Sequence, residues 1–247
     1  MVLTMKFKLC SHGVSDKGLV RTNNEDAWTT STRERLFVLA DGLGGHQAGE
    51  VAAKEAVDAF SDSFHKIFIE SGQHELSEVE IIEALRLCFE RTNNRVYEMS
   101  CEHELLRGMG TTFCVLSFHG DMAAISHVGD SRIYLLRNGQ FEQLTKDHCW
   151  TRRFLPDGEE KMCKGVLTRA LGTTAEVEPT IRLLKICPDD LFLLCSDGLS
   201  DMLSQDEIEG VVTQSATIGQ RVRMLVSEAK KKGGGDNITV VLVEVQS

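Results

Sequence analysis

Short runs rich in β-branched and aromatic residues recur along the chain and predict β-strands. Nine such runs are expected, at residues 6–14, 27–31, 36–40, 112–118, 122–128, 132–136, 141–144, 191–195 and 238–245. The pair Asn138-Gly139 stands between two of them and is typical of a tight hairpin turn. Strands therefore make up a large part of the expected fold.

Four other segments predict helices. Residues 48–67 and 81–99 repeat apolar side chains every three or four positions, as amphipathic helices do. A capping box, Ser77-x-x-Glu80, begins the second, and Ser204-x-x-Glu207 begins a short third helix. The fourth, at 217–231, ends in lysines followed by glycines, which suits a helix C-terminus. Strands and helices do not alternate regularly, so the order favours antiparallel sheets with helices packed outside them, an α+β sandwich.

Composition limits the class of protein. The 247 residues are 42% hydrophobic and 26% charged, and they contain no repeat or linker, so we expect one domain over residues 1–247. No apolar run is long enough for a membrane span, and the first residues lack the pattern of a signal peptide, which predicts a cytoplasmic protein. A formal net charge of −10 disfavours nucleic acid and anionic membranes as partners. Eight cysteines without a Cys-x-x-Cys pair predict reduced, mostly buried thiols.

Two apolar runs end in the same way. LFVLADGLGG places Asp41 and a glycine after one predicted strand, and LFLLCSDG places Asp197 and a glycine after another. An Asp-Gly pair is usually a simple turn, as we expect for Asp157-Gly158, which follows a proline and no strand. Asp41 and Asp197 differ because each follows a nearly continuous apolar strand, which would hold its carboxylate at the rim of a buried sheet.

Two further acids stand at strand ends. Asp236 comes directly before the last predicted strand, and Asp130 lies at a break between two strands. Acids that converge on one rim repel each other unless a positive charge compensates them. Carboxylates and a carbonyl freed by glycine are oxygen ligands that magnesium and manganese prefer, whereas zinc would favour histidine or cysteine. The pattern predicts a divalent metal site.

Near the N-terminus, SDKGLVRTNNEDAW places Arg21 a few residues before Glu25 and Asp26, between two predicted strands. Taken alone, this segment could equally be a solvated polar loop. Beside a metal cluster, however, a guanidinium offers a planar fork for phosphate oxygens that an ammonium group does not.

Together these residues resemble the PPM family, the type 2C metal-dependent protein phosphatases, and most of all the compact bacterial serine/threonine phosphatases. The motifs that carry the resemblance are SDKGLVRTNNEDA, ADGLGGH, GMGTT, HVGDSRIY, LTRALG, CSDGLSD and GGGDNITVVLV. The resemblance extends over nearly the whole chain, from about residue 9 to residue 245. The resemblance implies a four-layer α-β-β-α sandwich, in which two antiparallel β-sheets are flanked by helices, with two or three Mn²⁺ or Mg²⁺ ions at one edge.

The resemblance also assigns metal ligands. Asp41 would bridge two metal ions, the Gly42 carbonyl would bind one, and Asp197 and Asp236 would complete the other. A hydroxide held between the ions would attack phosphorus in line, with no phosphoenzyme. The expected substrates are proteins that carry phosphoserine or phosphothreonine as targets of a serine/threonine kinase, and the kinase itself is a candidate partner.

The remaining assignments surround this centre. Glu25 and Asp26 would act through metal-bound water, and Asp130 matches an aspartate that helps to hold a third, weaker metal ion. Arg21 matches the phosphate-binding arginine, so Arg21 and Asp41 are the expected catalytic residues.

Two departures from the family pattern stand out. Leu43 replaces a histidine that many eukaryotic members use as a general acid, which leaves His46 as a weak substitute. The segment from Asp147-His148 to LTRALG, which corresponds to the family's flap, is short and contains the basic pair Arg152-Arg153. The leaving-group proton and the flap's part in substrate choice are therefore left open.

Two other functions compete with a metal phosphatase. Cys163 and Arg169 have the Cys-x5-Arg spacing of a cysteine-dependent phosphatase, and so do Cys101 and Arg107, but neither has a glycine-rich loop or a preceding histidine. The second alternative is a catalytically inactive module of the same fold that binds phosphoproteins or a kinase. The aspartates at all the matched metal positions argue against it.

Overall fold

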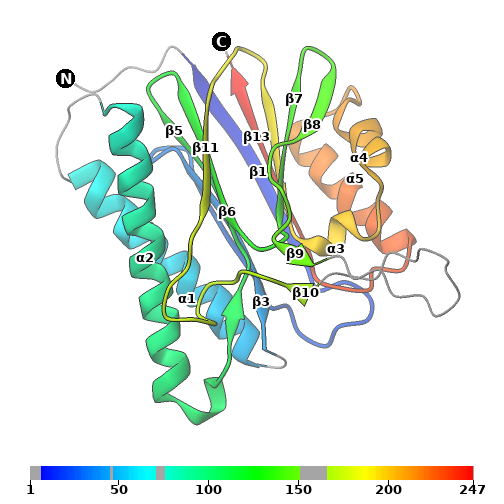
Figure 1. The fold of residues 1–247 in the computed structure, drawn as a ribbon. Helices are drawn as coiled ribbons and strands as arrows, with labels where there is room; N and C mark the ends of the chain where they lie inside the picture. The colour runs from blue at the N-terminus through cyan, green and yellow to red at the C-terminus, as the bar shows by residue number, and fades with distance from the viewer. Residues whose placement is uncertain (1–6, 45–46, 71–75, 151–165, 247) are drawn as a thin grey trace, which may run out of the picture.

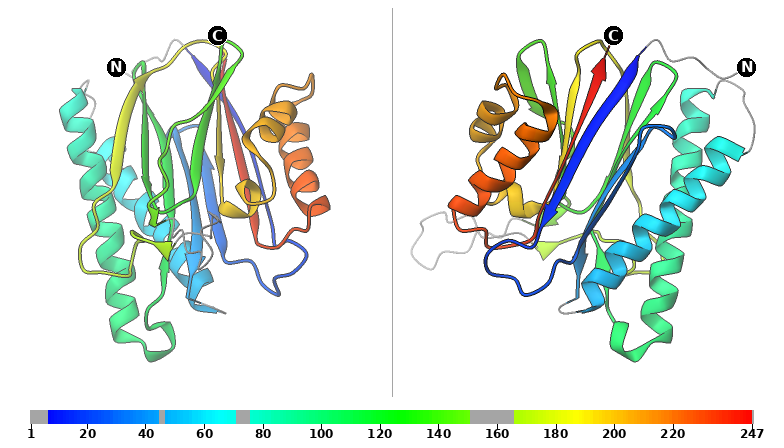
Figure 2. Two further views of the ribbon diagram at one scale, coloured as in Figure 1. Left: turned by 45° about the vertical axis from the view of Figure 1, so that its right-hand side comes forward. Right: turned by 180° about the vertical axis from the view of Figure 1, so that it is seen from behind.

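Two antiparallel β-sheets packed face to face form the centre of the molecule in this computed structural model, which describes residues 7–44, 47–70, 76–150 and 166–246. Helices cover the outer face of each sheet, which gives the layer order helix, sheet, sheet, helix (Figures 1 and 2). The predicted α+β sandwich is therefore confirmed. None of the helices in the described part of the chain is long and apolar enough to cross a membrane.

The first sheet has the strand order β1-β13-β12-β7-β8, so the two ends of the chain pair with each other. Its strands are β1 (Lys8–Asp16), β13 (Ile238–Gln246), β12 (Leu191–Cys195), β7 (Arg132–Arg137) and β8 (Gln140–Gln143). Asn138 and Gly139 have φ values of 52° and 75° between β7 and β8, as the predicted hairpin turn requires. The outer face of this first sheet packs on the helices α3 (Asp197–Ser200), α4 (Gln205–Val212) and α5 (Ile218–Lys231).

The second sheet has the order β11-β6-β5-β3-β2, with a two-residue strand added beside β3. Its strands are β11 (Thr180–Lys185), β6 (Met122–Val128), β5 (Phe113–His119), β3 (Leu36–Leu43), β2 (Asp26–Ser31) and β4 (Gly110–Thr111). It packs on α1 (Gln47–Phe64), continued by the π-helical turn η1 (His65–Glu70), and on α2 (Glu78–Glu102), followed by the 3-10 turn η2 (Glu104–Leu106). A separate ribbon joins β9 (Cys149–Trp150) to β10 (Val166–Leu167).

Side-chain alternation along the central strands separates two kinds of core. Phe37 and Leu39 of β3 pack between the sheets against a cluster that includes Phe192 and Val241, with no helix contributing. The alternate residues of the same strands, such as Val38, face the helices instead. Each central strand is therefore buried on both faces, which explains why its sequence reads as a continuous apolar run.

The predicted elements agree with the structure except at a few positions. The capping boxes at Ser77 and Ser204 are both present. The first helix was expected to reach residue 67, but α1 ends at Phe64 and the chain continues as η1. The strand β11 was not predicted, because it is an edge strand whose exposed Thr180, Arg182 and Lys185 interrupt the apolar pattern.

Candidate active site

Two of the predicted acids lie side by side on the second sheet. Asp26 and Asp41 are direct partners in the pairing of β2 with β3. Asp41 has the same phase on β3 as Phe37 and Leu39, which pack between the sheets. Its carboxylate therefore continues the inter-sheet face beyond the end of the apolar core. The strand was expected to end at residue 40, but it extends past Asp41 to Leu43.

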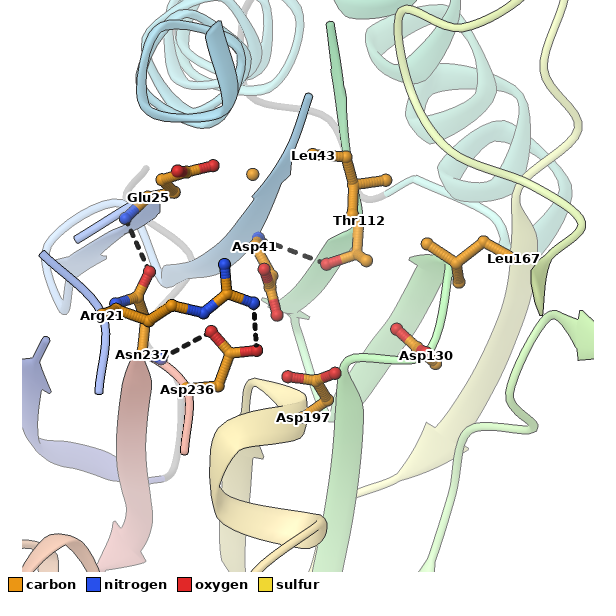
Figure 3. Close-up of a pocket in the computed structure, with 11 residues that line it drawn as sticks. Arg21, Glu25, Asp41, Leu43, Thr112, Asp130, Leu167, Asp197, Asp236 and Asn237 are labelled. Carbon is orange, nitrogen blue, oxygen red and sulfur yellow. Dashed lines mark hydrogen bonds and ion pairs between the residues drawn. The ribbon is translucent and has the colours of Figure 1, made fainter. Parts of the chain in front are cut away.

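The first sheet contributes two acids to the same end. Asp236 precedes β13, as predicted, and Asp197 is the first residue of the short helix α3, two residues beyond the predicted strand end. The glycine after Asp197 is required by packing, because a Cβ on Gly198 would lie 1.9 Å from the Asn237 carbonyl oxygen. The turn that leads into α3 is thereby fitted against the start of β13, which brings Asp197 close to Asp236 (Figure 3).

Asp130 comes from the turn that joins the two sheets. It lies between β6 and β7, after Gly129, whose φ of 102° is a conformation that favours glycine. A Cβ on Gly129 would also approach the Thr112 Cβ to 2.6 Å. This close turn places Asp130 on the side of the site opposite Arg21 (Figure 3).

These segments enclose one pocket of about 300 Å³ at the edge of the sandwich. Five acidic side chains and one arginine line it, together with smaller polar and apolar groups. The lining residues are Arg21, Glu25, Asp41, Gly42, Leu43, Thr112, Asp130, Leu167, Asp197, Asp236 and Asn237. The acids come from segments that are up to 211 residues apart in the sequence, from Glu25 to Asp236, and only the folded chain brings them together.

Arg21 reaches into this pocket from the loop between β1 and β2. Its Nη2 lies 2.8 Å from Oδ2 of Asp236, and the half-exposed guanidinium is drawn between Asp236 and Asp41 (Figure 3). The ion pair with Asp236 is the main reason that the pKa of Arg21 is raised. Arg21 is therefore a fixed positive charge within reach of a phosphate group in the pocket.

Polar side chains in the pocket wall hold the acids in place. The Asn237 amide accepts a hydrogen bond from the Glu25 backbone N–H (2.8 Å) and donates to the carbonyl oxygens of Lys17 and Asn23. Thr112 Oγ1 accepts from the Asp41 backbone N–H (3.2 Å). These bonds join the loop of Arg21 to the start of β13, and β3 to the start of β5.

Asp26 lies beside the pocket and is not one of its lining residues. Its Oδ2 accepts hydrogen bonds from the hydroxyls of Ser196 (2.9 Å) and Thr239 (2.6 Å), whereas its buried Oδ1 has no protein partner. Burial raises the pKa of Asp26 to about 7, although these two hydrogen bonds oppose the rise. A buried oxygen without a partner at this position suits a ligand or an ordered water.

Asp41 is a buried and strongly perturbed acid. Burial raises the pKa of its carboxyl well above the usual range, and the surrounding carboxylates of Asp26, Asp197, Asp236 and Asp130 raise it further. Such a cluster of negative charges, partly removed from water, is unfavourable for folding unless cations neutralise it.

The donor set fits hard divalent cations by its chemistry, because it consists of carboxylate oxygens with backbone carbonyls nearby. Gly42 also lines the pocket, and its position requires glycine, since a Cβ there would lie 2.2 Å from the Gly49 carbonyl oxygen and 2.7 Å from that of Glu25. As the side chains stand, however, no group of three or more acids, histidines or cysteines among the described residues is arranged to hold an ion. The side chains, among them Asp236 in its ion pair with Arg21, would have to rotate to ligate one.

The structure thus brings together Arg21, Glu25, Asp41, Gly42, Asp130, Asp197 and Asp236 around one pocket, with Asp26 behind it. Sequence reasoning did not find Thr112, Leu167 and Asn237 as site residues. All three stand inside motifs quoted above, GMGTT, LTRALG and GGGDNITVVLV, which was the available signal.

Several earlier candidates lie elsewhere. His46, Asp157, Cys163 and the pair Arg152-Arg153 lie outside the described residues. Cys101 is an exposed residue near the end of α2 and does not line the pocket. Leu43, which replaces the histidine of many eukaryotic members, does line it.

Comparison with known proteins identifies the family. The model of the family protein phosphatase 2C matches residues 19–231. The serine/threonine phosphatase stp of Listeria monocytogenes is 34% identical over 241 residues, which are 93% of each chain. The serine/threonine protein phosphatase PstP of Mycobacterium tuberculosis is 38% identical over 239 residues, and the match covers 94% of this chain but 44% of that longer protein.

Solved structures agree with this result. The crystal structure of the PstP catalytic domain in complex with two manganese ions superposes with a TM-score of 0.81 at 33% identity, covering 98% of this chain and 100% of that chain. A serine/threonine phosphatase of Staphylococcus aureus superposes with a TM-score of 0.82 at 28% identity, covering 97% and 96%. The chain therefore belongs to the metal-dependent PPM (protein phosphatase 2C) family and is a serine/threonine protein phosphatase.

Proposed function

We propose that the acidic pocket is the catalytic centre in which this phosphatase hydrolyses phosphoserine and phosphothreonine. The observation that carries the proposal is the convergence of five acidic side chains from distant segments on one pocket that also contains an arginine. The proposed site consists of Arg21, Glu25, Asp26, Asp41, Gly42, Asp130, Asp197 and Asp236.

The cofactor is proposed to be two or three Mn²⁺ or Mg²⁺ ions. Asp41, the Gly42 carbonyl, Asp197 and Asp236 would hold two of them, and Asp130 would help to hold a third. Glu25 and Asp26 would accept hydrogen bonds from water around the ions, which suits the unpartnered Oδ1 of Asp26. When bound, such ions supply positive charge and lower the pKa of water toward neutrality, which is the chemistry that phosphate ester hydrolysis needs.

Arg21 is proposed to bind the phosphate of the substrate. Its guanidinium is already held in the pocket by Asp236, and its planar fork can donate two parallel hydrogen bonds to phosphate oxygens. Positive charge placed before the reaction begins stabilises the charge on the transferring group. Arg21 would therefore orient the substrate and support the transition state.

The proton for the leaving serine or threonine oxygen is proposed to come from solvent. Leu43 lines the pocket where many eukaryotic relatives have histidine, and a leucine side chain has no proton to give. The described lining residues include no histidine.

Phosphorylated proteins are the substrates of a protein phosphatase, and we propose that these include targets of a serine/threonine kinase and the kinase itself. The net charge of −10 remains an argument against nucleic acid and anionic membranes as partners. A cytoplasmic location and a single domain over residues 1–247, with its core at 9–245, remain predictions from the sequence.

A panel of peptides that carry phosphoserine, phosphothreonine or phosphotyrosine tests the proposal, with manganese, magnesium or EDTA. We expect turnover of the first two classes with either metal and none in EDTA. Asp197→Asn should abolish turnover. The matched control is Asp189→Asn, an exposed aspartate in a turn with φ of 66°, a conformation that asparagine tolerates.

Activity that survives EDTA would contradict a metal centre and favour a cysteine nucleophile. If Asp197→Asn were as active as wild type and the Asp189→Asn control, the assignment of the catalytic centre to the acidic pocket would be wrong. A wild-type protein that binds phosphopeptides but hydrolyses none would instead be an inactive binding module of this fold.

A further inference from the structure

His148 lies between two parts of the pocket wall without lining the pocket itself. On one side it holds the turn that carries Asp130. The His148 backbone N–H donates to the Gly129 carbonyl oxygen (2.9 Å), and its ring Nδ1 accepts from the Gly129 N–H (3.2 Å). One residue thus satisfies both backbone groups of the glycine that precedes Asp130.

On its other side His148 holds the ribbon formed by β9 and β10. His148 comes directly before β9, and its carbonyl oxygen accepts a hydrogen bond from the Thr168 N–H (2.9 Å), directly after β10. Leu167, the last residue of β10, lines the pocket on the same side as Asp130 (Figure 3). The pocket residues Asp130 and Leu167 are therefore each next to a residue that His148 binds.

The imidazole ring has a stacking partner and a contact at each of its two nitrogens. It stacks on His127 with ring centroids 4.4 Å apart and an interplanar angle of 20°. Its Nε2 lies 3.0 Å from the Thr180 hydroxyl and 3.5 Å from Nη1 of Arg169. Because Nδ1 accepts from Gly129, the pattern assigns the proton of the neutral ring to Nε2, which donates to Thr180.

The neutral form is the stable one at physiological pH. Burial lowers the pKa of His148 to about 4, and the neighbouring His127 and the Arg169 guanidinium lower it further. Nδ1 therefore remains available as an acceptor. A protonated ring would place a donor against the Gly129 N–H.

We propose that His148 is a positioning residue, which holds the Asp130 turn and the root of the β9–β10 ribbon in one arrangement through the bond from Gly129 to Nδ1. His148 does not line the pocket, so it acts through Gly129 and Thr168. The inference rests on the proposed function of the pocket, because the arrangement matters for turnover only if Asp130 and Leu167 border the reacting group.

Two isosteric variants separate the two ring nitrogens. His148→Asn places an amide oxygen near the position of Nδ1 and can still accept from Gly129. His148→Gln places an amide nitrogen near the position of Nε2 and can still donate to Thr180, but it leaves the Gly129 N–H without its partner. Only the asparagine is expected to rescue the positioning role.

The measurements are kcat and KM on a phosphothreonine peptide with manganese, and amide hydrogen exchange at Gly129 and Thr168. We expect His148→Gln to lower kcat by about tenfold and to raise the exchange rate at Gly129 by a similar factor, as loss of one hydrogen bond implies. His148→Asn should keep both within about threefold of wild type. His103→Asn, at an exposed position after α2, is the matched control.

Equal kcat in the asparagine and glutamine variants, or unchanged exchange at Gly129 in His148→Gln, would overturn the proposal and leave His148 a purely structural residue. The exchange experiment does not depend on activity. An inactive wild type would therefore overturn the proposed function while the exchange data still decide whether His148 holds Gly129.

Discussion

The space between the two sheets is filled in one way along its length and in another at its end. In the interior, Phe37 and Leu39 of β3 face Phe192 and Leu194 of β12 in an apolar cluster. Two residues beyond Leu39, in the same phase of the strand, the next inward side chain is Asp41. The inward-facing side chains of β3 are thus two core residues followed by an acid at the end of the strand.

The difference teaches that the two parts have opposite effects on stability. Burial of the apolar cluster stabilises the sandwich, because each large side chain removed from water contributes about 2 kcal/mol. The acidic end removes carboxylates from water beside one another, which destabilises the fold when no cation is bound. Stability given up at a site is a general mark of function.

The largest expected effect comes from removing the charge of the central acid. Asp41→Asn should lower kcat on a phosphothreonine peptide by about a thousandfold or more at saturating manganese, because the loss affects the transition state directly. In EDTA the same variant should have a free energy of unfolding about 1 kcal/mol higher than that of wild type, because the cluster of buried carboxyl groups loses one member that repels the others.

The exposed Asp189→Asn serves as the control and should change neither quantity. If Asp41→Asn kept wild-type activity, or became less stable in EDTA, then the contrast between the acidic end and the interior would be wrong.

The second effect belongs to the interior. Phe192→Ala should lower the free energy of unfolding by about 3–5 kcal/mol, because it leaves a cavity between the sheets. The folded fraction should keep kcat within about twofold, since Phe192 does not reach the pocket. Urea unfolding and activity at 15 °C measure the two quantities on one sample.

A change at an exposed leucine calibrates this result. Leu105→Ala, at a side chain that is 94% exposed, should change the free energy of unfolding by less than about 0.5 kcal/mol. A Phe192→Ala protein that is fully folded, as stable as wild type and inactive would show that the interior and its end are not separable.

The third effect tests whether Arg21 compensates the negative charge of the acidic pocket and binds phosphate there. Arg21→Ala should raise KM for a phosphopeptide by between about tenfold and a hundredfold and change kcat less, because the guanidinium binds phosphate in the ground state as well. Arg21→Lys should recover a part of the loss, since an ammonium group keeps the charge without the planar fork. Equal KM values for all three proteins would exclude Arg21 from phosphate binding.

The position of these acids at strand ends could be predicted from the sequence, because strand phase and Asp-Gly pairs are local signals. The apolar run before Asp41 showed that its strand is buried on both faces, and the observed pairing with Asp26 then follows from the antiparallel sheet. The sequence could not show that Asp26 would be held by Ser196 and Thr239, because those contacts join residues that are 170 and 213 positions apart.

Other features of the structure could not be predicted from the sequence, and the physical reasons are clear. The strand β11 is defined by its pairing with β6 at the sheet edge, and its own pattern of exposed polar residues is too weak to predict a strand. For His148 the sequence gives only its place at the start of the segment that departs from the family pattern, and predicts no role for its side chain. Its contacts with Gly129 and Thr180 depend on the arrangement of three segments, which local periodicity does not encode.

The smallest expected effect lies at the opposite end of β5 from the pocket. His119 packs against the ring of Phe68, with centroids 4.7 Å apart, and its Nε2 lies 2.9 Å from the Ser117 hydroxyl. Burial lowers the pKa of His119 to about 4, and the Arg35 guanidinium adds to this. Between pH 4 and 6.5 the unfolded chain therefore binds a proton at His119 that the folded protein does not.

The free energy of unfolding should consequently fall as the pH is lowered through that window, by about 1 kcal/mol between pH 7 and pH 5 from this one group after allowance for solvent screening. His119→Phe keeps an aromatic ring against Phe68 and removes the proton site, so its stability should vary less with pH than that of wild type. Urea unfolding at both pH values measures this difference, with the exposed His103→Asn as the control. An identical change in the wild type and His119→Phe would mean that the acidic end, rather than the buried histidine, governs the response of the molecule to mild acid.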